Sequence, residues 1–391
     1  MAKKLRVGVL FGGRSSEHEV SLVSAASVLR GLDPAKYEII PIGITKEGRW
    51  LLLRSLAESL AARLSGGHPT HSHLRRALAD GQAVVLPAEP TEAALVPAGP
   101  AAAAPTAPLP LDVIFPVLHG TFGEDGTLQG LFELANVPYV GAGVLGSALG
   151  MDKEVQKRLF AQAGLPIPKY VVVSRRRWRD DRQAVLRAVQ RRLRFPVFVK
   201  PANLGSSVGI SKVTRAAALP SALEHAAEFD RKILVEQGIR GREFEVSVLG
   251  NDDPKASVPG EVIPGRAFYD YTAKYLEDTT RFVVPARLPP RPVRRLQELA
   301  VAAFHATECA GMARVDFFLQ HSTGRIYLNE LNTIPGFTAI SMYPKLWEAS
   351  GLTYPQLLDR LIELALERHR EKSRTRFSID LPRRRGGVLK E

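Results

Sequence analysis

The sequence is poor in cysteine and contains no long hydrophobic run. Cys309 is the only cysteine among 391 residues, so no intrachain disulfide can form, which argues against a secreted, cross-linked scaffold. The apolar run near the start ends at Gly12 and Gly13, far too early for a signal peptide or a membrane-spanning helix. We therefore expect a protein of the reducing cytoplasm that does not insert into a membrane.

The two common nucleotide-binding fingerprints are also missing. The glycine-rich segment Gly205–Gly209 does not match the phosphate loop G-x-x-x-x-G-K-[ST], and GGRSSE after the first predicted strand does not match the dinucleotide fingerprint G-x-G-x-x-G. Any nucleotide site must therefore be built in another way.

Length and charge set broad limits. A chain of 391 residues exceeds what one compact core holds, so we expect two or three domains. Hydrophobic residues make up 45% of the chain and charged residues 24%, a balance typical of a globular protein. The 53 Lys and Arg against 40 Asp and Glu give a net charge of +13, which favours anionic partners such as nucleic acid, membrane surfaces or small phosphates without choosing among them.

The first 145 residues or so read as an open α/β domain. Short apolar runs at 7–10, 38–42 and 113–117 predict strands, and 21–29 predicts a helix after the first of them. In such a domain the active groups gather where strands end. The uncharged, Ala/Pro-rich stretch 96–110 predicts an exposed, semi-rigid loop.

Two further modules follow along the chain. A helix is expected from Met151, with Val155 and Leu159 on one face and Gly164 just past its end. A small α+β module then contains the predicted strands 195–200 and 233–236. A third region starts near Gly241 and includes a Tyr-rich loop at 268–278, a helix at 294–309, a hairpin and, after Lys372, a basic tail that we expect to be frayed.

The hairpin is the most informative segment. Apolar runs flank the turn 321–324, and alternation along the second strand puts Glu330 and Asn332 on one face, with Asp316 roughly opposite Glu330. Two close carboxylates need a cation, and oxygen ligands suit Mg²⁺. The alternative is a solvated polar face. Against that alternative, the strands are otherwise strongly apolar, and unpaired charges in a buried sheet are costly.

A second candidate site follows Lys200 at the end of a strand. The small residues of PANLGSSVG let backbone N–H groups approach a phosphate while the lysine supplies charge. A mobile Gly/Ser turn is the alternative interpretation.

A third candidate combines Glu17 with His119 and Glu124, which follow two different predicted strands. A carboxylate at a helix start can equally be a partner of the helix dipole, and both interpretations stay open. The Tyr-rich loop FYDYTAKYLED has no obvious strand partner and is typical of a lid.

Other polar clusters favour plain structural interpretations. His68, His71 and His73 lack carboxylate support and predict a surface loop rather than a metal site. Nine arginines between Arg175 and Arg194 with one interleaved aromatic predict a solvated helix face. Cys309 follows the apolar pattern of its helix and is expected in the core.

Eight motifs in this order resemble the D-alanine–D-alanine ligases of the ATP-grasp superfamily: GGRSSEHEVSL, HGTFGEDGTLQG, GSALGMDK, VKPANLGSSVGISKV, REFEVSVLG, FYDYTAKYL, RVDFF and NELNTIPGFT. The resemblance spans about residues 5 to 370. It implies a three-domain ATP-grasp architecture of α/β and α+β units, with an N-terminal Rossmann-like domain at 1–145, a central subdomain at 146–240, a C-terminal subdomain at 241–372 and a flexible tail at 373–391.

The resemblance implies a nucleotide and metal site between the central and C-terminal subdomains. Two Mg²⁺ ions, replaceable by Mn²⁺, would bridge the ATP phosphates and be held by Asp316, Glu330 and Asn332. Phosphate charge would be met by Lys153, Lys200, Lys274 and the loop residue Ser207. The adenine would contact Glu236 and Ile239, and the ribose Glu243. Gln237 departs from the lysine that some relatives carry, which leaves purine selectivity open.

The resemblance also implies how the amino acids bind. Glu17 would pair with the ammonium of the first D-alanine, near His119 and Glu124. Arg314 and the N–H of Gly336 would form an oxyanion site. Ser206 and Tyr275 would connect a lid to Glu17, and Ser341 would bind the carboxylate of the second D-alanine. The first D-alanine would be phosphorylated to an acyl phosphate that the amine of the second attacks, giving a dipeptide for peptidoglycan.

Other interpretations than the ligation of two D-alanines are also open. The same fold can use D-lactate or D-serine as acceptor, although Tyr275 favours D-alanine. A nucleic-acid-binding protein would explain the charge, but the acidic constellation and the missing stacking platforms argue against it. We expect ATP and D-alanine as ligands, a homodimer, a cytoplasmic location, and neither nucleic acid nor membrane as partner.

Overall fold

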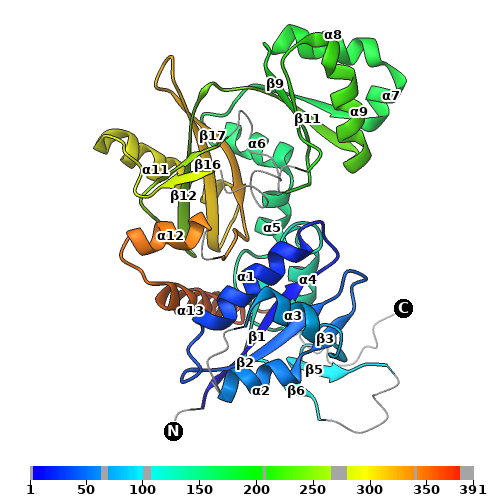
Figure 1. The fold of residues 1–391 in the computed structure, drawn as a ribbon, viewed down its shortest axis with the longest axis vertical. Helices are drawn as coiled ribbons and strands as arrows, with labels where there is room; N and C mark the ends of the chain where they lie inside the picture. The colour runs from blue at the N-terminus through cyan, green and yellow to red at the C-terminus, as the bar shows by residue number, and fades with distance from the viewer. Residues whose placement is uncertain are drawn as a thin grey trace, which may run out of the picture.

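The computed structural model describes residues 3–62, 69–99, 107–205, 208–265, 280–338 and 341–378, and these residues form three β-sheets with helices around them (Figure 1). The sheets follow one another along the chain. Within the described residues, no helix is both long and apolar enough to cross a membrane.

The N-terminal sheet has seven strands in the order β6-β5-β4-β3-β2-β1-β7, with β1 parallel to β2 and to β7 and the remaining pairs antiparallel. This arrangement confirms the predicted open α/β domain. Its strands are β1 (Leu5–Gly12), β2 (Tyr37–Ile44), β3 (Trp50–Leu52), β4 (Gln82–Val85), β5 (Ala94–Pro97), β6 (Leu109–Pro110) and β7 (Val113–Val117). Its helices are α1 (His18–Gly31), α2 (Arg54–Ala62), α3 (His71–Ala77), α4 (Thr127–Leu134) and α5 (Val144–Met151).

A tight turn connects β1 to α1. Gly12 has φ +93°, and a Cβ there would lie 2.2 Å from the carbonyl oxygen of Ile44, so a side chain has no room. The N–H of Gly12 donates to Ser21 Oγ (2.8 Å), and Ser21 in turn donates to the carbonyl of Val117. These bonds place the start of α1 beside the end of β7.

The central sheet has four antiparallel strands in the order β10-β9-β11-β8. Three helices cover its outer side in Figure 1. The strands are β8 (Tyr170–Ser174), β9 (Val197–Pro201), β10 (Ser211–Val213) and β11 (Lys232–Gln237), and the helices are α7 (Arg175–Asp180), α8 (Arg182–Arg192) and α9 (Leu219–Phe229), preceded by a 3₁₀ turn at Ala216–Ala218.

The C-terminal sheet is antiparallel, in the order β15-β14-β12-β16-β17 with β13 on β12. Its strands are β12 (Gly241–Gly250), β13 (Lys255–Ala256), β14 (Gly260–Ile263), β15 (Arg281–Val283), β16 (Gly311–Gln320) and β17 (Ile326–Asn332). Its helices are α11 (Pro290–Ala306) and α12 (Met342–Ala349), followed by α13 (Tyr354–Lys372).

The last helix returns to the first domain. The buried residues Leu357, Leu358 and Leu361 of α13 share one hydrophobic core with strands β1 and β7. Phe337, just after β17, packs its ring edge-on against Phe115 of β7 at 5.9 Å between centroids. The chain therefore ties its C-terminal part to its N-terminal sheet at the point where β17 ends.

The helix α6 (Lys153–Gln162) differs from the prediction. Asp152 caps it by accepting from two backbone N–H groups, so α5 and α6 are separate helices. Its buried face carries Glu154, Gln156, Lys157 and Phe160, whereas Val155 and Leu159 are only half-buried. The apolar pattern indicated the wrong face because this helix packs beside a polar site rather than in a hydrophobic core.

Two loop predictions are wrong in part. The Ala/Pro-rich stretch 96–110 ends in β6, an edge strand, where a missing N–H is tolerated. His71 and His73 lie on α3, where Thr70 Oγ accepts from the backbone N–H of His73. Threonine is a favoured N-cap residue, and Thr70 fills that role at the start of this helix. His68 lies outside the described residues.

We expect Leu361→Ala to destabilise the fold by about 2–5 kcal/mol, because it leaves a cavity where α13 packs on the N-terminal sheet. Urea denaturation measures the free energy of unfolding. Arg370→Ala, exposed on the same helix, is the control and should stay within about 0.5 kcal/mol of wild type. An equal effect of the two substitutions would contradict this packing.

Candidate active site

A cavity of about 670 Å³ lies between the central and C-terminal sheets. Its walls come from β9, β11, β12, β16 and β17 and from the loop after β11. Six of the residues predicted from the sequence line it: Lys200, Glu236, Ile239, Glu243, Asp316 and Glu330. These residues, predicted to bind the nucleotide and its metal ions, therefore line one cavity. Some of them come from the central sheet and others from the C-terminal sheet.

The hairpin β16–β17 has the predicted register. Asp316 is paired with Glu330, and Arg314 with Asn332. The alternation of side chains then puts all four on one face of the sheet. Asp316 accepts from both Nε and Nη2 of Arg314 at 2.8 Å, and Nδ2 of Asn332 donates to Asp316 Oδ2 at 3.2 Å.

Arg314 is held by a second carboxylate as well. Its Nε lies 3.0 Å from Glu245 Oε2 on the neighbouring strand β12, where Glu245 is paired with Asp316 in register. Burial disfavours the guanidinium charge, but the carboxylates of Asp316 and Glu245 outweigh it and raise the pKa of Arg314 above its ordinary value. Arg314 is therefore a fixed cation on this face.

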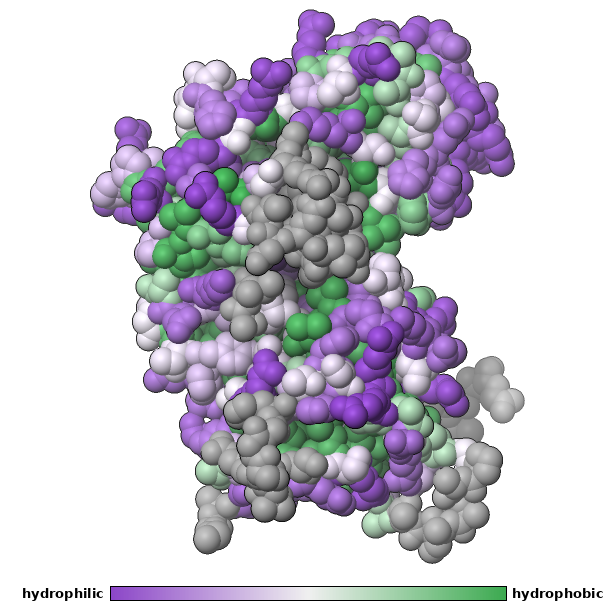
Figure 2. Space-filling model, viewed as in Figure 1, coloured by the Kyte–Doolittle hydropathy of each residue, from purple (hydrophilic) through white to green (hydrophobic). Residues whose placement is uncertain are grey.

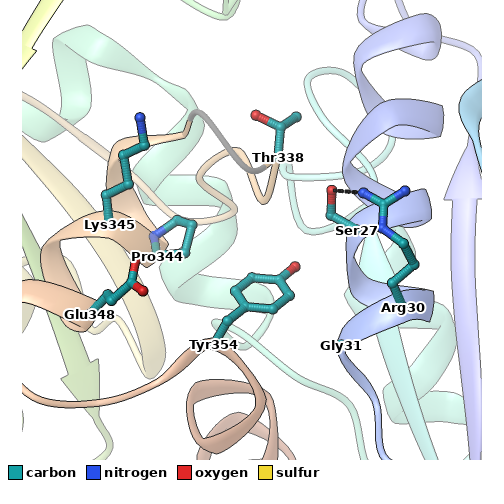
Figure 3. Close-up of a pocket in the computed structure, with 8 residues that line it drawn as sticks. All are labelled: Ser27, Arg30, Gly31, Thr338, Pro344, Lys345, Glu348 and Tyr354. Carbon is teal, nitrogen blue, oxygen red and sulfur yellow. Dashed lines mark hydrogen bonds between the residues drawn. The ribbon is translucent and has the colours of Figure 1, made fainter. Parts of the chain in front are cut away.

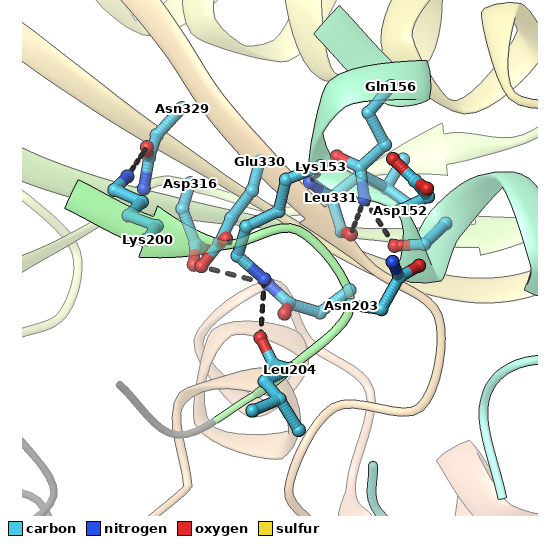
Figure 4. A network of polar contacts seen from close by, with 12 residues as sticks. Asp152, Lys153, Gln156, Lys200, Asn203, Leu204, Asp316, Asn329, Glu330 and Leu331 are labelled. Atoms are coloured by element: carbon cyan, nitrogen blue, oxygen red, sulfur yellow. Dashed lines mark hydrogen bonds and ion pairs between the residues drawn. The ribbon is translucent and has the colours of Figure 1, made fainter. Parts of the chain in front are cut away.

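Lys153 connects the start of α6 to the metal-binding candidates. Its Nζ donates to the carbonyl of Leu204 at 2.7 Å and lies 3.4 Å from Glu330 Oε2. Figure 4 shows Lys153 pointing toward Asp316 and Glu330 while Lys200 lies on their other side. Two lysines therefore flank the carboxylates, as a phosphate-binding site requires.

The floor of the cavity holds a buried carboxylate between two lysines. Glu236 and Lys157 are each 2% exposed, and Lys157 Nζ lies 2.8 Å from Glu236 Oε2. Lys200 Nζ lies 3.5 Å from Glu236 Oε1. Burial alone would raise the pKa of Glu236, but the two ammonium groups reverse this and lower it. Glu236 is therefore a carboxylate at neutral pH.

The side chains fit a divalent cation. Among the described residues, no cluster of three or more His, Cys, Asp or Glu side chains could hold a metal. Asp316 and Glu330 nevertheless stand opposite each other, with Asn332 next along the strand. Mg²⁺ is commonly held by one or two carboxylates together with substrate phosphates, so this oxygen set is sufficient when a nucleotide supplies the rest.

Glu17 forms the centre of a second group, at the N-terminus of α1. It is 7% exposed, and its backbone N–H donates to Ser15 Oγ at 3.0 Å. A Cβ on Gly205 would lie 2.6 Å from Glu17 Oε2, and one on Gly120 would lie 2.8 Å from the same atom. The carboxylate therefore lies against the glycine-rich loop after β9 and against the turn after β7.

Glu124 and His119 hold the segment after β17. Glu124 accepts from the N–H groups of Gly120 (2.7 Å) and Ile334 (3.1 Å). Burial and the nearby Glu17 charge raise the pKa of Glu124 to about 8. Burial lowers the pKa of His119, so its ring is neutral at pH 7. Nδ1 contacts the carbonyl of Ile334 at 3.1 Å.

These contacts assign the tautomer of His119. A carbonyl can only accept, so Nδ1 carries the proton and Nε2 accepts from Ser24 Oγ at 3.1 Å. Ser24 Oγ also accepts from the N–H of Phe337 at 3.4 Å. The result is a bonded chain from β7 to the segment that carries Gly336.

Ser341 lies at the start of α12, close to Gly336. A Cβ on Gly336 would lie 2.8 Å from Ser341 Oγ. That oxygen accepts from the N–H of Thr338 at 3.0 Å and shares a hydrogen bond with Thr338 Oγ1 at 2.7 Å. Gly336 and Ser341 therefore face each other across a short loop.

A smaller cavity of about 370 Å³ lies between this loop and the helices α1, α12 and α13. Thr338 and Ser27 lie at one end and Tyr354 at the other (Figure 3). Arg30, which faces it, donates to Ser27 Oγ at 3.1 Å and to the carbonyl of Pro69 at 2.8 Å. Residues predicted from the sequence do not line this cavity, but Thr338, which is hydrogen-bonded to Ser341, does.

The arginines of α7 and α8 are not among the residues that line the inter-sheet cavity. All nine between Arg175 and Arg194 are exposed while Trp178 is buried, which confirms the predicted solvated face. Figure 2 shows the hydrophilic surface that this end of the molecule presents. Much of the net positive charge is therefore on exposed side chains that do not line the cavity. Cys309 is buried in a core cluster, as predicted.

Some predicted residues lie outside the described part of the chain, namely Ser206, Ser207, Lys274, Tyr275 and most of the tail. Other residues at the site were missed: Lys157, Glu245, Asn329 and Ser24. Two of them carried a usable signal. Lys157 follows Lys153 by one helical turn, and Glu245 follows Glu243 on the same face of β12.

Comparisons with known proteins agree with this geometry. Family models described as the N-terminus and the C-terminus of D-ala D-ala ligase match residues 6–142 and 159–363. A D-alanine--D-alanine ligase of Heliobacterium modesticaldum is 50% identical over 371 residues, covering 95% of this chain and 97% of the relative. One from Solibacter usitatus is 51% identical over 375 residues, with 96% and 99% covered.

Solved structures show the same similarity. The D-alanine-D-alanine ligase from Coxiella burnetii aligns with a TM-score of 0.81 and 39% identity, over 95% of this chain and 97% of that one. The VanG D-Ala:D-Ser ligase from Enterococcus faecalis aligns with a TM-score of 0.80 and 37% identity, over 93% and 100%.

We expect Glu124→Gln to change how stability depends on pH. Glu124 keeps its proton up to about pH 8 when folded but ionises near its ordinary pKa of 4.5 when unfolded. The folded state thus binds more protons in this window, and the contribution of Glu124 to stability falls as the pH rises from about 4.5 to 8. Relative to Glu124→Gln, the wild type should lose stability across this window and level off above it.

Unfolding free energies of both proteins from pH 4 to pH 9 test this expectation, with the exposed Glu224→Gln as control. A difference between wild type and Glu124→Gln that does not vary with pH would contradict the raised pKa.

Proposed function

This chain belongs to the D-alanine–D-alanine ligase family, and from that premise we propose which residues carry out its reaction. The enzyme joins two D-alanines to D-alanyl-D-alanine through an acyl phosphate and releases ADP and phosphate, a step of peptidoglycan precursor synthesis. The observation that carries the assignment of roles is the facing pair Asp316 and Glu330 on the wall of the inter-sheet cavity.

ATP binds in the cavity between the two sheets. Its adenine contacts Glu236 and Ile239, and its ribose contacts Glu243. The phosphates meet Lys153 and Lys200, together with Lys274 and Ser207 from segments outside the described residues. In support, Lys200, Glu236, Ile239 and Glu243 all line the cavity, and Lys153 lies 3.4 Å from Glu330.

Asp316, Glu330 and Asn332 hold two Mg²⁺ ions, which Mn²⁺ can replace. When bound, such ions neutralise the charge that builds up on transferring phosphate oxygens. The protein provides the ligand oxygens on one rigid hairpin face, and Arg314 orients the Asp316 carboxylate through two hydrogen bonds of 2.8 Å.

Glu17 binds the ammonium of the first D-alanine. A carboxylate at 7% exposure strongly favours a cationic partner. The D-alanine carboxylate attacks the γ-phosphorus, so a bond from oxygen to phosphorus forms while the bond to ADP breaks. This step is needed because a free carboxylate is a poor acyl donor.

The second D-alanine then attacks the acyl carbon through its neutral amine. A bond from nitrogen to carbon forms, the amine gives up a proton and phosphate leaves. Arg314 and the N–H of Gly336 stabilise the oxygen that becomes negative, and Ser341 binds the carboxylate of the acceptor. His119 and Glu124 support substrate binding by holding the segment that carries Gly336.

Water must be kept from the acyl phosphate. We assign this to a lid that includes Tyr275 and is connected to Glu17 through Ser206, both outside the described residues. D-serine or D-lactate as acceptor is the second candidate function, and the D-Ala:D-Ser ligase among the similar structures gives specific support to D-serine.

We take the active form to be a homodimer in the cytoplasm, with ATP and D-alanine as its ligands and without nucleic acid or membrane as partner. We also keep the domain boundaries near residues 145, 240 and 372.

ADP release with ATP and Mg²⁺ should require D-alanine, and the product should have the mass of D-alanyl-D-alanine. L-alanine, D-serine and D-lactate serve as competing acceptors. Glu330→Gln should lower kcat by about a hundredfold or more, since a metal-held phosphate charge is worth several kcal/mol. Glu298→Gln, exposed on α11, is the control. Release that ignores D-alanine would overturn the assignment.

Gly205→Ala should displace Glu17 without truncating it, because the added Cβ would lie 2.6 Å from its Oε2. We expect the KM for the first D-alanine to rise by about tenfold to a hundredfold, since small misplacements are costly in active sites, with the KM for ATP far less affected. Gly130→Ala is the control, because nothing lies within 4 Å of its Cβ. Steady-state kinetics in D-alanine that match wild type would refute the placement.

A further inference from the structure

Lys157 has no role in the reaction described so far, although its position is unusual. It is 2% exposed on α6, and burying a lysine charge is costly unless it is paired. Its Nζ lies 2.8 Å from Glu236 Oε2 and donates to the carbonyl of Asn329 at 3.1 Å. A side chain held this way usually serves a specific purpose, and the partner here is the proposed adenine contact.

Lys157 reaches from one sheet to the other. Gln156, its neighbour, fixes α6 to β17 through two hydrogen bonds of 2.9 Å with the backbone of Leu331. Figure 4 shows Gln156 pointing at Leu331 from the first turns of α6. The base of Lys157 is therefore anchored to the C-terminal sheet, whereas Glu236 belongs to β11 of the central sheet.

A bulge in the hairpin makes room for this contact. The register of β16 and β17 shifts between Asp316 and Phe317, which leaves Asn329 without a partner residue. The backbone carbonyl of Asn329 accepts from Lys157, and its side-chain oxygen lies 3.4 Å from Lys200 Nζ. The bulged residue thus contacts both lysines that hold Glu236.

The two lysines are not equivalent. Lys200, Glu236 and Asn329 line the cavity, and Lys157 is not among the residues that line it. Lys200 is therefore accessible to nucleotide phosphates, while Lys157 can act on a bound nucleotide only through the cavity residues that it contacts, the Glu236 carboxylate and the backbone carbonyl of Asn329. Lys157 would therefore remain beside Glu236 if Lys200 turned to a nucleotide phosphate.

We propose that Lys157 is a positioning residue that holds the Glu236 carboxylate as a hydrogen-bond acceptor facing the base, and that it thereby sets the preference for adenine over hypoxanthine. This inference rests on the proposed role of Glu236 as the adenine contact. A carboxylate accepts but cannot donate, so it accepts from the 6-amino group of adenine and repels the 6-oxo group of hypoxanthine. Without Lys157 the carboxylate is free to turn away or take up a proton.

The test uses Lys157→Met, which removes the charge and keeps the length. Calorimetry with ATP and with ITP, without D-alanine, gives two affinities. We expect ATP affinity to fall about tenfold, as for a lost charge-assisted hydrogen bond, and ITP affinity to change little, so the ATP/ITP ratio falls about tenfold. In turnover, the KM for ATP should rise while the KM for D-alanine stays near wild type.

Two controls separate this role from plain stability. Arg158→Met changes the adjacent, exposed residue and should leave the ratio unchanged. Lys157→Arg keeps the charge and should recover part of the preference for ATP. An unchanged ATP/ITP ratio in a folded Lys157→Met protein, or a fall in kcat with the KM for ATP unchanged, would overturn the inference.

If Lys157→Met does not fold, the pair is tested together. Glu236→Gln and the double variant Lys157→Met/Glu236→Gln should then have the same ATP/ITP ratio, because the proposed effect of Lys157 on the base is exerted through Glu236. A further fall in the double variant would contradict the proposal. Nucleotide binding is measured without D-alanine, so failure of the ligase assignment, seen as missing D-alanine-dependent ADP release in wild type, is distinguishable from failure of this inference.

Discussion

The register of the β16–β17 hairpin is the constraint on which the rest of the site depends. It sets Asp316 opposite Glu330 and Arg314 opposite Asn332, so that acidic, basic and amide groups share one sheet face. A slip by one residue would send these side chains into the hydrophobic core behind the sheet. The adjacent strand adds Glu245 beside Asp316, and α6 adds Lys153 beside Glu330. Each of these contacts requires the hairpin to be in place first.

The other half of the site depends on how the chain returns to the N-terminal domain. The segment after β17 is fixed by Glu124 and by the chain of bonds through His119 and Ser24, while Phe337 packs against Phe115. The hydrophobic core that contains the buried residues of α13 also contains Phe337, so packing holds this segment as well. Glu17 and Gly336, which come from opposite ends of the chain, are thus kept in one place by packing as well as by hydrogen bonds. The proposed substrate site therefore draws its residues from both the N-terminal and the C-terminal part of the chain.

Sequence reasoning succeeded where the determining contacts are local. A turn flanked by alternating apolar strands was enough to place Asp316 opposite Glu330, because pairing in a hairpin follows from its turn. Sequence reasoning failed where the contact joins residues that are far apart in the sequence. The spacing from Lys153 puts Lys157 on the same side of its helix, but its burial and its partner Glu236, which comes from another strand, do not follow from that spacing. For the same reason the prediction of which face of α6 is buried is wrong, because the buried face of this helix is mostly polar. The bulge at Asn329 interrupts the alternation, because the buried Leu328 and Leu331 lie three residues apart rather than two or four. The substrate was inferred from the order of the motifs and not from periodicity.

Local charge balance explains how a basic protein can hold an acidic site. The exposed arginines of α7 and α8 carry much of the net charge at one end of the molecule and do not reach the cleft. Around the cleft, four carboxylates each lie close to a cation instead. The carboxylates of Glu236, Glu245, Asp316 and Glu330 are matched by the cations of Lys153, Lys157, Lys200 and Arg314. A nucleoside triphosphate that arrives with divalent cations is close to neutral, so it can enter without upsetting this balance. In the proposed reaction the lysines would turn from carboxylates to phosphates and the carboxylates would hold the metal, so that each charge would exchange one partner for another without being left unpaired in a buried site.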